Sequence, residues 1–161
     1  MHNLFDRLEK LQIKHTLYTH KPLFTSDEAN AEYDRLAIPN EFGRCKNLFL
    51  KDSKKRFWLI VALYDTQIKL KELSKTLQAP ELRFADETFL MHYLGVKPGS
   101  VTPFGLINDA EHAITVVIDD ALLKKARVGF HPLSNDATLF ITPADLFKFI
   151  ADCGNRMLTG I

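Results

Sequence analysis

Three short segments carry residue types that suit chemistry at an ester or carbonyl group. The first runs from Cys45 to Leu50, where Lys46 and Asn47 precede an apolar run. A lysine at the start of a strand can bind a phosphate, a ribose hydroxyl or a carbonyl oxygen. Most lysines are solvated surface residues, however, so this segment alone does not assign Lys46 a role.

The second segment, residues 96–106, has two prolines and two glycines around the hydroxyl residues Ser100 and Thr102. Proline stiffens such a loop, whereas a glycine such as Gly99 lets a ligand approach the backbone closely. The composition suits a substrate-binding loop, and it suits a structural link between a helix and a strand equally well.

The third segment, residues 129–138, delivers Gly129, His131 and Asn135 at the end of an expected strand. Backbone N–H groups beside a glycine and a neutral amide can stabilise a developing oxyanion. A plain hairpin in which the histidine and asparagine cap turns has the same composition.

Two other kinds of chemistry are less well supported. Cys45 lies beside Lys46, whose charge could lower the pKa of the thiol, so a nucleophilic cysteine with His131 as base is an alternative. The other histidines have no paired spacing, and two cysteines are too few for a zinc site. We therefore expect no metal and no cofactor.

The bulk properties indicate an ordinary globular protein. The chain has 161 residues, 46% of them hydrophobic, and a net charge of +1, so we expect one compact domain over residues 1–161. A charge this small cannot hold a long nucleic acid, and any such contact must be local. The N-terminus lacks the apolar core of a signal peptide, and no run is long enough to span a membrane. We expect a cytoplasmic monomer.

Apolar periodicity and turn residues predict the elements that must position these segments. Helices are expected at residues 4–13, 26–36, 69–77, 86–94 and 143–153. Strands are expected at residues 16–20, 47–51, 57–64, 105–107, 113–118, 126–130 and 138–141, with a loop at 37–45. This order favours an α+β fold with a single mixed, largely antiparallel sheet packed with helices.

The chain resembles the YbaK/ProX aminoacyl-tRNA editing family, and within it the free-standing Ala-tRNA(Pro) deacylases. The strings that carry the resemblance are TSDEA at 25–29, KNLFLKD at 46–52, PGSVTPFGLIND at 98–109 and FHPLSNDAT at 130–138. Their order and spacing cover the chain from about residue 15 to about residue 150. The sequence departs from many relatives just before Lys46, where Arg44-Cys45 stands in place of a histidine.

The resemblance implies a pocket for the alanyl group on the 3′-terminal adenosine of tRNA(Pro). It implies catalytic roles for Lys46, His131 and Asn135, with water as nucleophile and activation by the 2′-hydroxyl of the tRNA. The substrate-binding residues that it implies, including the two glycines where backbone approaches the substrate, are Thr25, Ser26, Asn47, Gly99, Ser100, Thr102 and Gly129.

Several alternatives remain at this point. The same pocket could belong to a non-catalytic module that binds tRNA or a synthetase, or to a deacylase for Cys-tRNA(Pro) or Ser-tRNA. Prolyl-tRNA synthetase is a possible partner. The basic cluster Lys51, Lys54, Lys55 and Arg56 flanks the turn at residues 52–55 and could contact tRNA phosphates, or it could form a solvated turn.

Overall fold

The computed structural model describes residues 2–161. The helices are α1 (His2–Lys10), α2 (Ser26–Arg35), α3 (Leu70–Leu77), α4 (Glu87–Leu94) and α5 (Pro143–Cys153). The strands are β1 (Thr16–Thr19), β2 (Phe42–Lys51), β3 (Phe57–Leu63), β4 (Arg83–Phe84), β5 (Ile114–Ile118), β6 (Arg127–Phe130), β7 (Ala137–Ile141) and β8 (Met157–Leu158). Two short 3₁₀ helices, η1 (Pro103–Asn108) and η2 (Asp120–Lys124), lie on either side of β5 in the chain.

Within this range the strands form one mixed, eight-stranded sheet. Its order is β1-β7-β6-β2-β3-β5-β8, and the short β4 pairs with β2. The pairs β1–β7, β6–β7, β2–β3 and β2–β4 are antiparallel, and the pairs β2–β6, β3–β5 and β5–β8 are parallel. The predicted α+β fold with a single mixed sheet is confirmed.

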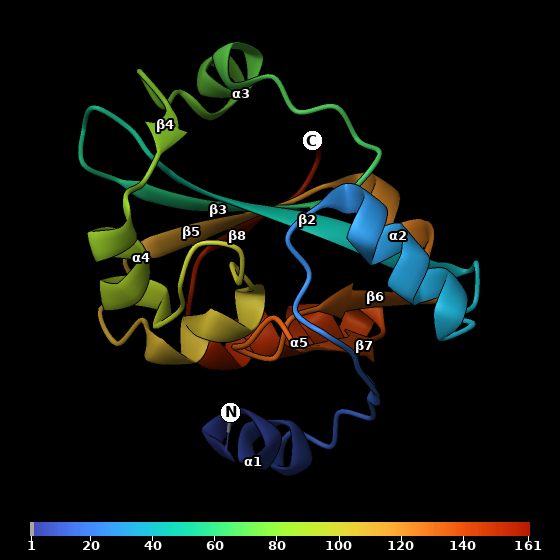
Figure 1. Cartoon of the computed structure of the whole chain (residues 1–161). Coiled ribbons are helices and arrows are strands. Elements are labelled where there is room, and N and C mark those ends of the chain that lie inside the picture. The colour runs from blue at the N-terminus through green and yellow to red at the C-terminus, as the bar shows by residue number, and fades with distance from the viewer. Residues whose placement is uncertain (1) are drawn as a thin grey trace.

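Two apolar clusters lie on the two faces of this sheet. On β3, Leu59 and Val61 belong to the larger cluster with α1, α4, α5 and η1, whereas Trp58 and Ile60 belong to the smaller one under α3. Figure 1 shows this arrangement, with α3 on one side of the sheet and the other three helices opposite. Because both faces are covered, β3 is apolar throughout and not alternating.

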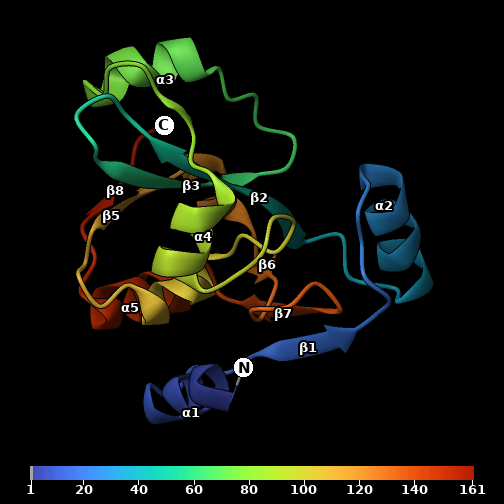
Figure 2. The same cartoon turned by 60° about the vertical axis from the view of Figure 1, so that its left-hand side comes forward.

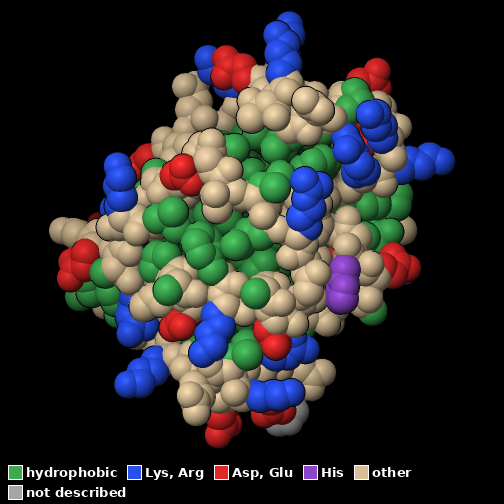
Figure 3. Space-filling model, turned by 180° about the vertical axis from the view of Figure 1, so that it is seen from behind, with side chains coloured by type: hydrophobic (Ala, Val, Ile, Leu, Met, Phe, Trp, Pro, Cys, Tyr) green, Lys and Arg blue, Asp and Glu red, His purple; other side chains and the backbone are tan. Residues whose placement is uncertain are grey.

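The remaining helix, α2, stands at the side of the molecule, apart from the helices that cover the sheet (Figure 2). Seen from behind, hydrophobic side chains gather in the middle of the surface, with cationic and anionic side chains of both signs around them (Figure 3). Among residues 2–161, no helix combines the length and the apolar character needed to cross a bilayer.

Local signals explain why several predicted helices begin and end where they do. The Thr25 hydroxyl accepts a hydrogen bond from the backbone N–H of Glu28 at the start of α2, and Asp86 and Thr142 cap α4 and α5 in the same way. Gly95 ends α4 in a left-handed conformation, with φ of 66°. The predicted starts of these three helices are confirmed.

Two predictions were wrong. Residues 105–107 are not a strand, because Thr102 accepts a hydrogen bond from the backbone of Phe104 and Pro103 then begins the 3₁₀ helix η1. Residues 42–45 are not loop, since Phe42, Gly43 and Arg44 already pair in parallel with β6. Strands β4 and β8 and the helix η2 were not predicted.

Candidate active site

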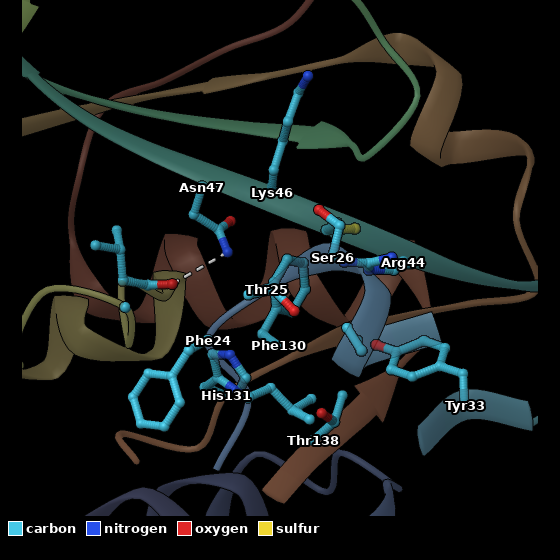
Figure 4. Close-up of a pocket in the computed structure, with 16 residues that line it drawn as sticks. Phe24, Thr25, Ser26, Tyr33, Arg44, Lys46, Asn47, Phe130, His131 and Thr138 are labelled. Atoms are coloured by element: carbon cyan, nitrogen blue, oxygen red, sulfur yellow. Dashed lines mark hydrogen bonds between the residues drawn. The ribbon is translucent and has the colours of Figure 1, made fainter. Parts of the chain in front are cut away.

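A pocket of about 380 Å³ opens between the start of α2, the first half of β2 and the β6–β7 turn. Figure 4 shows how side chains from these separate segments converge on it. The residues that line it are Leu23, Phe24, Thr25, Ser26, Ala29, Tyr33, Arg44, Cys45, Lys46, Asn47, Gly99, Val101, Gly129, Phe130, His131 and Thr138. Seven of the ten predicted site residues are among them: Thr25, Ser26, Lys46, Asn47, Gly99, Gly129 and His131.

Strand β2 places Lys46 and Asn47 on opposite faces, because successive side chains of a strand alternate. In Figure 4 the Lys46 side chain leaves β2 on the side away from His131 and Asn47. Lys46 is half-buried, and within residues 2–161 its ammonium makes no ion pair. It is therefore available to an anionic or carbonyl group of a bound substrate.

Asn47 is fixed by one hydrogen bond and keeps an unused acceptor. Its amide Nδ2 donates to the carbonyl of Val101, at 3.2 Å, which ties β2 to the loop at residues 96–102. Because that carbonyl needs a donor, the amide orientation is set, and the buried Oδ1 is left without a hydrogen-bond partner. A buried acceptor without a partner costs about 1–3 kcal/mol. A hydroxyl or ammonium donor from a substrate would remove that cost.

His131 has one ring nitrogen occupied and one open. Its Nδ1 lies 3.0 Å from the carbonyl of Ala137, and a carbonyl can only accept, so Nδ1 carries the proton and Nε2 is an acceptor in the neutral ring. Burial lowers the pKa of His131 below its usual 6.5, and the hydrogen bond to Ala137 partly opposes this. The ring is thus neutral near pH 7 and can act as a base.

His20 supports this part of the pocket from behind. Its ring centroid lies 6.4 Å from that of His131. Its Nδ1 lies 2.8 Å from the carbonyl of Lys21, so Nε2 of the neutral ring accepts from the hydroxyl of Thr138, at 2.9 Å. Only 8% of His20 is exposed, so the ring belongs to the interior.

The two predicted hydroxyl residues at the start of α2 are already engaged. Thr25 accepts the helix-capping hydrogen bond, and the Ser26 hydroxyl contacts the hydroxyl of Tyr64. The guanidinium of Arg44 stacks over the Tyr64 ring, 4.0 Å from its centroid, and lies 5.9 Å from the centroid of Tyr33. These contacts fix the side of the pocket that α2 provides.

Three predicted site residues lie outside the pocket lining. Asn135 donates from Nδ2 to the carbonyl of Leu23, at 3.0 Å, so it holds a lining residue without reaching the pocket. Thr102 is fully buried and caps η1. Ser100 is half-buried and its backbone N–H closes a turn onto Lys97.

The two predicted glycines are present for different reasons. Gly99 has φ of +90° and open space around it, which suits close approach by a ligand. A Cβ on Gly129 would lie 2.4 Å from Cε1 of Phe140, so packing of that ring requires glycine. The packing of Phe140 is therefore enough to explain why position 129 is a glycine, without the expected approach of substrate to its backbone.

The alternative of a nucleophilic cysteine has little support. Cys45 packs against the core, and burial raises the pKa of its thiol to about 12. The Lys46 side chain leaves β2 on the opposite face. The thiol therefore remains protonated near pH 7 and is a poor nucleophile.

Sequence reasoning did not assign eight lining residues to the site, Leu23, Phe24, Ala29, Tyr33, Arg44, Val101, Phe130 and Thr138, and it considered Cys45 only as an alternative nucleophile. One signal was present, since Ser26, Ala29 and Tyr33 have the spacing of one face of a helix. Phe24 is 79% exposed, and nothing in the neighbouring sequence predicted this exposure.

Comparison with known proteins identifies the family of this chain. A family model described as the aminoacyl-tRNA editing domain matches residues 20–149. Prolyl-tRNA synthetase associated domain-containing protein 1 of Danio rerio is 39% identical over 147 residues, 90% of this chain and 78% of the relative. Prolyl-tRNA editing protein ProX of Acetoanaerobium sticklandii is 37% identical over 150 residues, 92% of this chain and 89% of the relative.

Solved structures agree with this assignment at the level of the fold. The structure of a candidate trans-editing enzyme for prolyl tRNA synthetase superposes with a TM-score of 0.69 at 18% identity, over 98% of this chain and 94% of the other. The resemblance found in the sequence is thus confirmed. The chain belongs to the aminoacyl-tRNA editing family and is a deacylase, an enzyme that hydrolyses the ester between an amino acid and its tRNA.

Proposed function

We propose that this chain hydrolyses the ester of Ala-tRNA(Pro) in trans, and so removes alanine that has been attached to the tRNA for proline. The observation that carries the proposal is the pocket itself, which brings Lys46 and Asn47 of β2 together with His131, from two segments far apart in the sequence. The relative from Acetoanaerobium sticklandii, named a prolyl-tRNA editing protein, supports the choice of tRNA.

The size of the acyl group explains why such an enzyme would be needed. A synthetic site built for proline cannot strongly exclude the smaller alanine, because each missing methylene changes binding by only about 1–3 kcal/mol. A second pocket that admits alanine but not proline supplies the missing discrimination. Here Val101, Phe130 and Leu23 are apolar lining residues that would limit the acyl group.

The reaction is attack of water on the ester carbonyl. The new C–O bond forms a tetrahedral oxyanion, the bond to the ribose 3′-oxygen breaks, and that oxygen takes up a proton. The products are free alanine and uncharged tRNA. In this scheme the Lys46 ammonium binds the ester carbonyl, a phosphate or the terminal ribose, and the open acceptor Oδ1 of Asn47 receives a donor from the substrate.

Two groups could take the proton of the attacking water. The neutral Nε2 of His131 is one, because Nδ1 is held by Ala137. The 2′-hydroxyl of the terminal adenosine is the other. Hydrolysis of a tRNA whose terminal adenosine lacks the 2′-hydroxyl separates them: we expect a large loss of rate, and normal cleavage would assign the role to the protein.

Single-turnover hydrolysis tests the proposal. Ala-tRNA(Pro), Cys-tRNA(Pro) and Pro-tRNA(Pro) are mixed with wild-type chain, with Lys46→Ala and with Lys10→Ala, an exposed lysine of α1 that serves as a matched control. We expect loss of the alanyl ester alone, abolished only by Lys46→Ala, with folding of each variant checked by circular dichroism. Faster hydrolysis of the cysteinyl ester would assign Cys-tRNA(Pro) as the substrate instead. No hydrolysis of any of the three esters would contradict the proposal.

The setting of the reaction is also part of the proposal. We propose that the chain acts in the cytoplasm as a single-domain monomer, and that it meets its substrate where prolyl-tRNA synthetase releases it. Sedimentation velocity tests the monomer. Addition of the synthetase to the hydrolysis assay tests the association, since a complex should raise the rate at low concentrations of charged tRNA.

A further inference from the structure

A second pocket, of about 420 Å³, lies at the far end of β2 from the active site, beside the β2–β3 turn and β4. Its lining contains three cationic side chains, two carboxylates and two aromatic rings. The residues are Lys51, Asp52, Ser53, Lys55, Arg83, Phe84, Ala85, Asp86 and Phe89. Cations together with aromatic faces are typical of surfaces that bind single-stranded nucleic acid, where the cations contact phosphates and the rings stack on bases.

Two cationic residues of this pocket are paired on neighbouring strands. Lys51 of β2 is directly opposite Arg83 of β4 in the antiparallel register. Like charges in directly opposed positions destabilise a sheet unless an anion lies between them. Arg83 has one partner, Glu81, at 3.5 Å, but both side chains are about 70% exposed and such a pair contributes little. An anionic ligand would relieve the repulsion.

The two carboxylates that line the pocket do not neutralise its lysines. Asp52 is buried and is occupied by the Arg56 guanidinium, the Trp58 indole N–H and the backbone N–H groups of Lys54 and Arg56. Asp86 accepts the capping hydrogen bond at the start of α4 and remains exposed. The nearby lysines at positions 51, 54 and 55 have no carboxylate partner within residues 2–161.

The aromatic residues are placed for contact with a ligand. The ring of Phe84 is 63% exposed, although a large apolar side chain usually lies inside. The Lys51 ammonium lies 4.6 Å from the centroid of the Phe89 ring, which holds the cation at the pocket. One open ring beside these cations suits a base and its flanking phosphates.

Both pockets lie on the same edge of β2, because β6 and β4 pair with the edge opposite to β3. Asn47 and Lys51, whose side chains lie on the same face of that strand, are four positions apart, about 14 Å at about 3.4 Å per residue. We propose that the second pocket binds the RNA strand that leads into the active site, with phosphates on Lys51, Lys55 and Arg83 and a base on Phe84. This rests on the proposed function.

Binding of RNA by a charge-matched pair of variants tests the idea. The probe is a fluorescent RNA hairpin with the acceptor stem of tRNA(Pro) and its single-stranded 3′ CCA end, measured by anisotropy over a range of salt concentrations. The test variant is Lys51→Gln/Lys55→Asn, in which asparagine suits the φ of 64° at position 55. The control is Lys10→Gln/Lys14→Asn, two exposed lysines at the end of α1 and just after it. Helix α1 lies at the opposite end of the molecule from β4 (Figure 1).

If two phosphate contacts are lost, the slope of log affinity against log salt should fall by about 1.4, at about 0.7 for each single-strand phosphate. Phe84→Ala should weaken binding at least about fivefold, whereas Phe84→Leu tests the need for an aromatic ring. Equal affinity and slope in the test and control pairs would overturn the proposal, as would full retention of binding in Phe84→Ala.

Hydrolysis of a truncated substrate distinguishes this inference from the proposed function. An adenosine that carries a 3′-alanyl ester but no phosphates should be cleaved equally by wild type and by the Lys51→Gln/Lys55→Asn variant. If the variant lost activity equally on the alanyl adenosine and on Ala-tRNA(Pro), a role of the second pocket in RNA binding would be contradicted. If wild type cleaves neither the alanyl adenosine nor Ala-tRNA(Pro), the proposed function fails. The anisotropy measurements still decide whether the second pocket binds RNA.

Discussion

Replacement of Asn135 by alanine separates a residue that positions the pocket from one that takes part in the reaction. Its Nδ2 donates to the carbonyl of Leu23, at 3.0 Å, and this contact ties the β6–β7 turn to the segment before α2. Asn135→Ala removes the donor and leaves the Leu23 carbonyl without it. The segment from Leu23 to Ser26, which lines the pocket, then loses one of its attachments.

The expected magnitude follows from the kind of contact. A neutral hydrogen bond contributes about 0.5–1.5 kcal/mol to stability. If all of it were needed to hold the pocket in its reactive shape, hydrolysis would slow by about 2- to 12-fold, at about 1.4 kcal/mol for each factor of ten. Removal of a group that directly stabilises the oxyanion costs about 100- to 1,000-fold in rate. The two ranges do not overlap.

The assay is single-turnover hydrolysis of the alanyl ester, below and above saturation, together with thermal unfolding. The matched control is Ser134→Ala in the same turn, whose hydroxyl donates a hydrogen bond to Asp136 at the surface and, among the described residues, makes no hydrogen bond to Leu23. We expect a small rate loss and a small loss of stability for Asn135→Ala and neither for the control. A loss above about 100-fold with unchanged stability would refute the positioning role.

Three further predictions follow from the same region. Gly129→Ala should lower the free energy of unfolding by about 1–3 kcal/mol, because its Cβ meets Phe140, and Gly129→Ala/Phe140→Leu should recover part of it in urea titrations; an unchanged midpoint for the single variant would contradict this. The pKa of His131 is below 6.5 in the folded chain, so the unfolded chain binds a proton first and stability should fall as pH drops below about 6.5. His131→Gln should show a smaller fall between pH 7.5 and 5.5, and an identical one would count against the shift. Cys45→Ser should keep hydrolysis within a few fold, and iodoacetamide at pH 8 should not inhibit wild type, because the thiol pKa is about 12.

Much of the fold could be predicted because its signals are local. Capping by Thr25, Asp86 and Thr142 and the apolar run of β3 are written in a few adjacent residues each. The errors came where distant partners decide the structure. Gly43 and Arg44 look like loop residues, and they become strand only because β6 lies beside them. Strand β4 exists in the same way, through its pairing with Leu50 and Lys51.

The candidate site was predictable to the extent that polar residues fall in short distinctive strings. Lys46, Asn47 and His131 all line the pocket. What the strings could not give was direction: Lys46 and Asn47 are neighbours in sequence, yet their side chains leave β2 on opposite faces. Nor could composition separate a substrate contact from a support, so Asn135 and Thr102 were grouped with the lining although one holds Leu23 and the other caps η1.

The pairing of β1 with β7 has a consequence for the time at which the chain becomes active. Residues near opposite ends of the chain meet there, and the backbone N–H of His20 bonds to the carbonyl of Asp136 beside them. Contacts between such distant residues form slowly, because the intervening chain must lose conformational entropy before the favourable contacts are made. During refolding, helices and the β2–β3 hairpin should therefore appear before hydrolysis recovers. During synthesis, the pocket cannot be complete until β7 has left the ribosome.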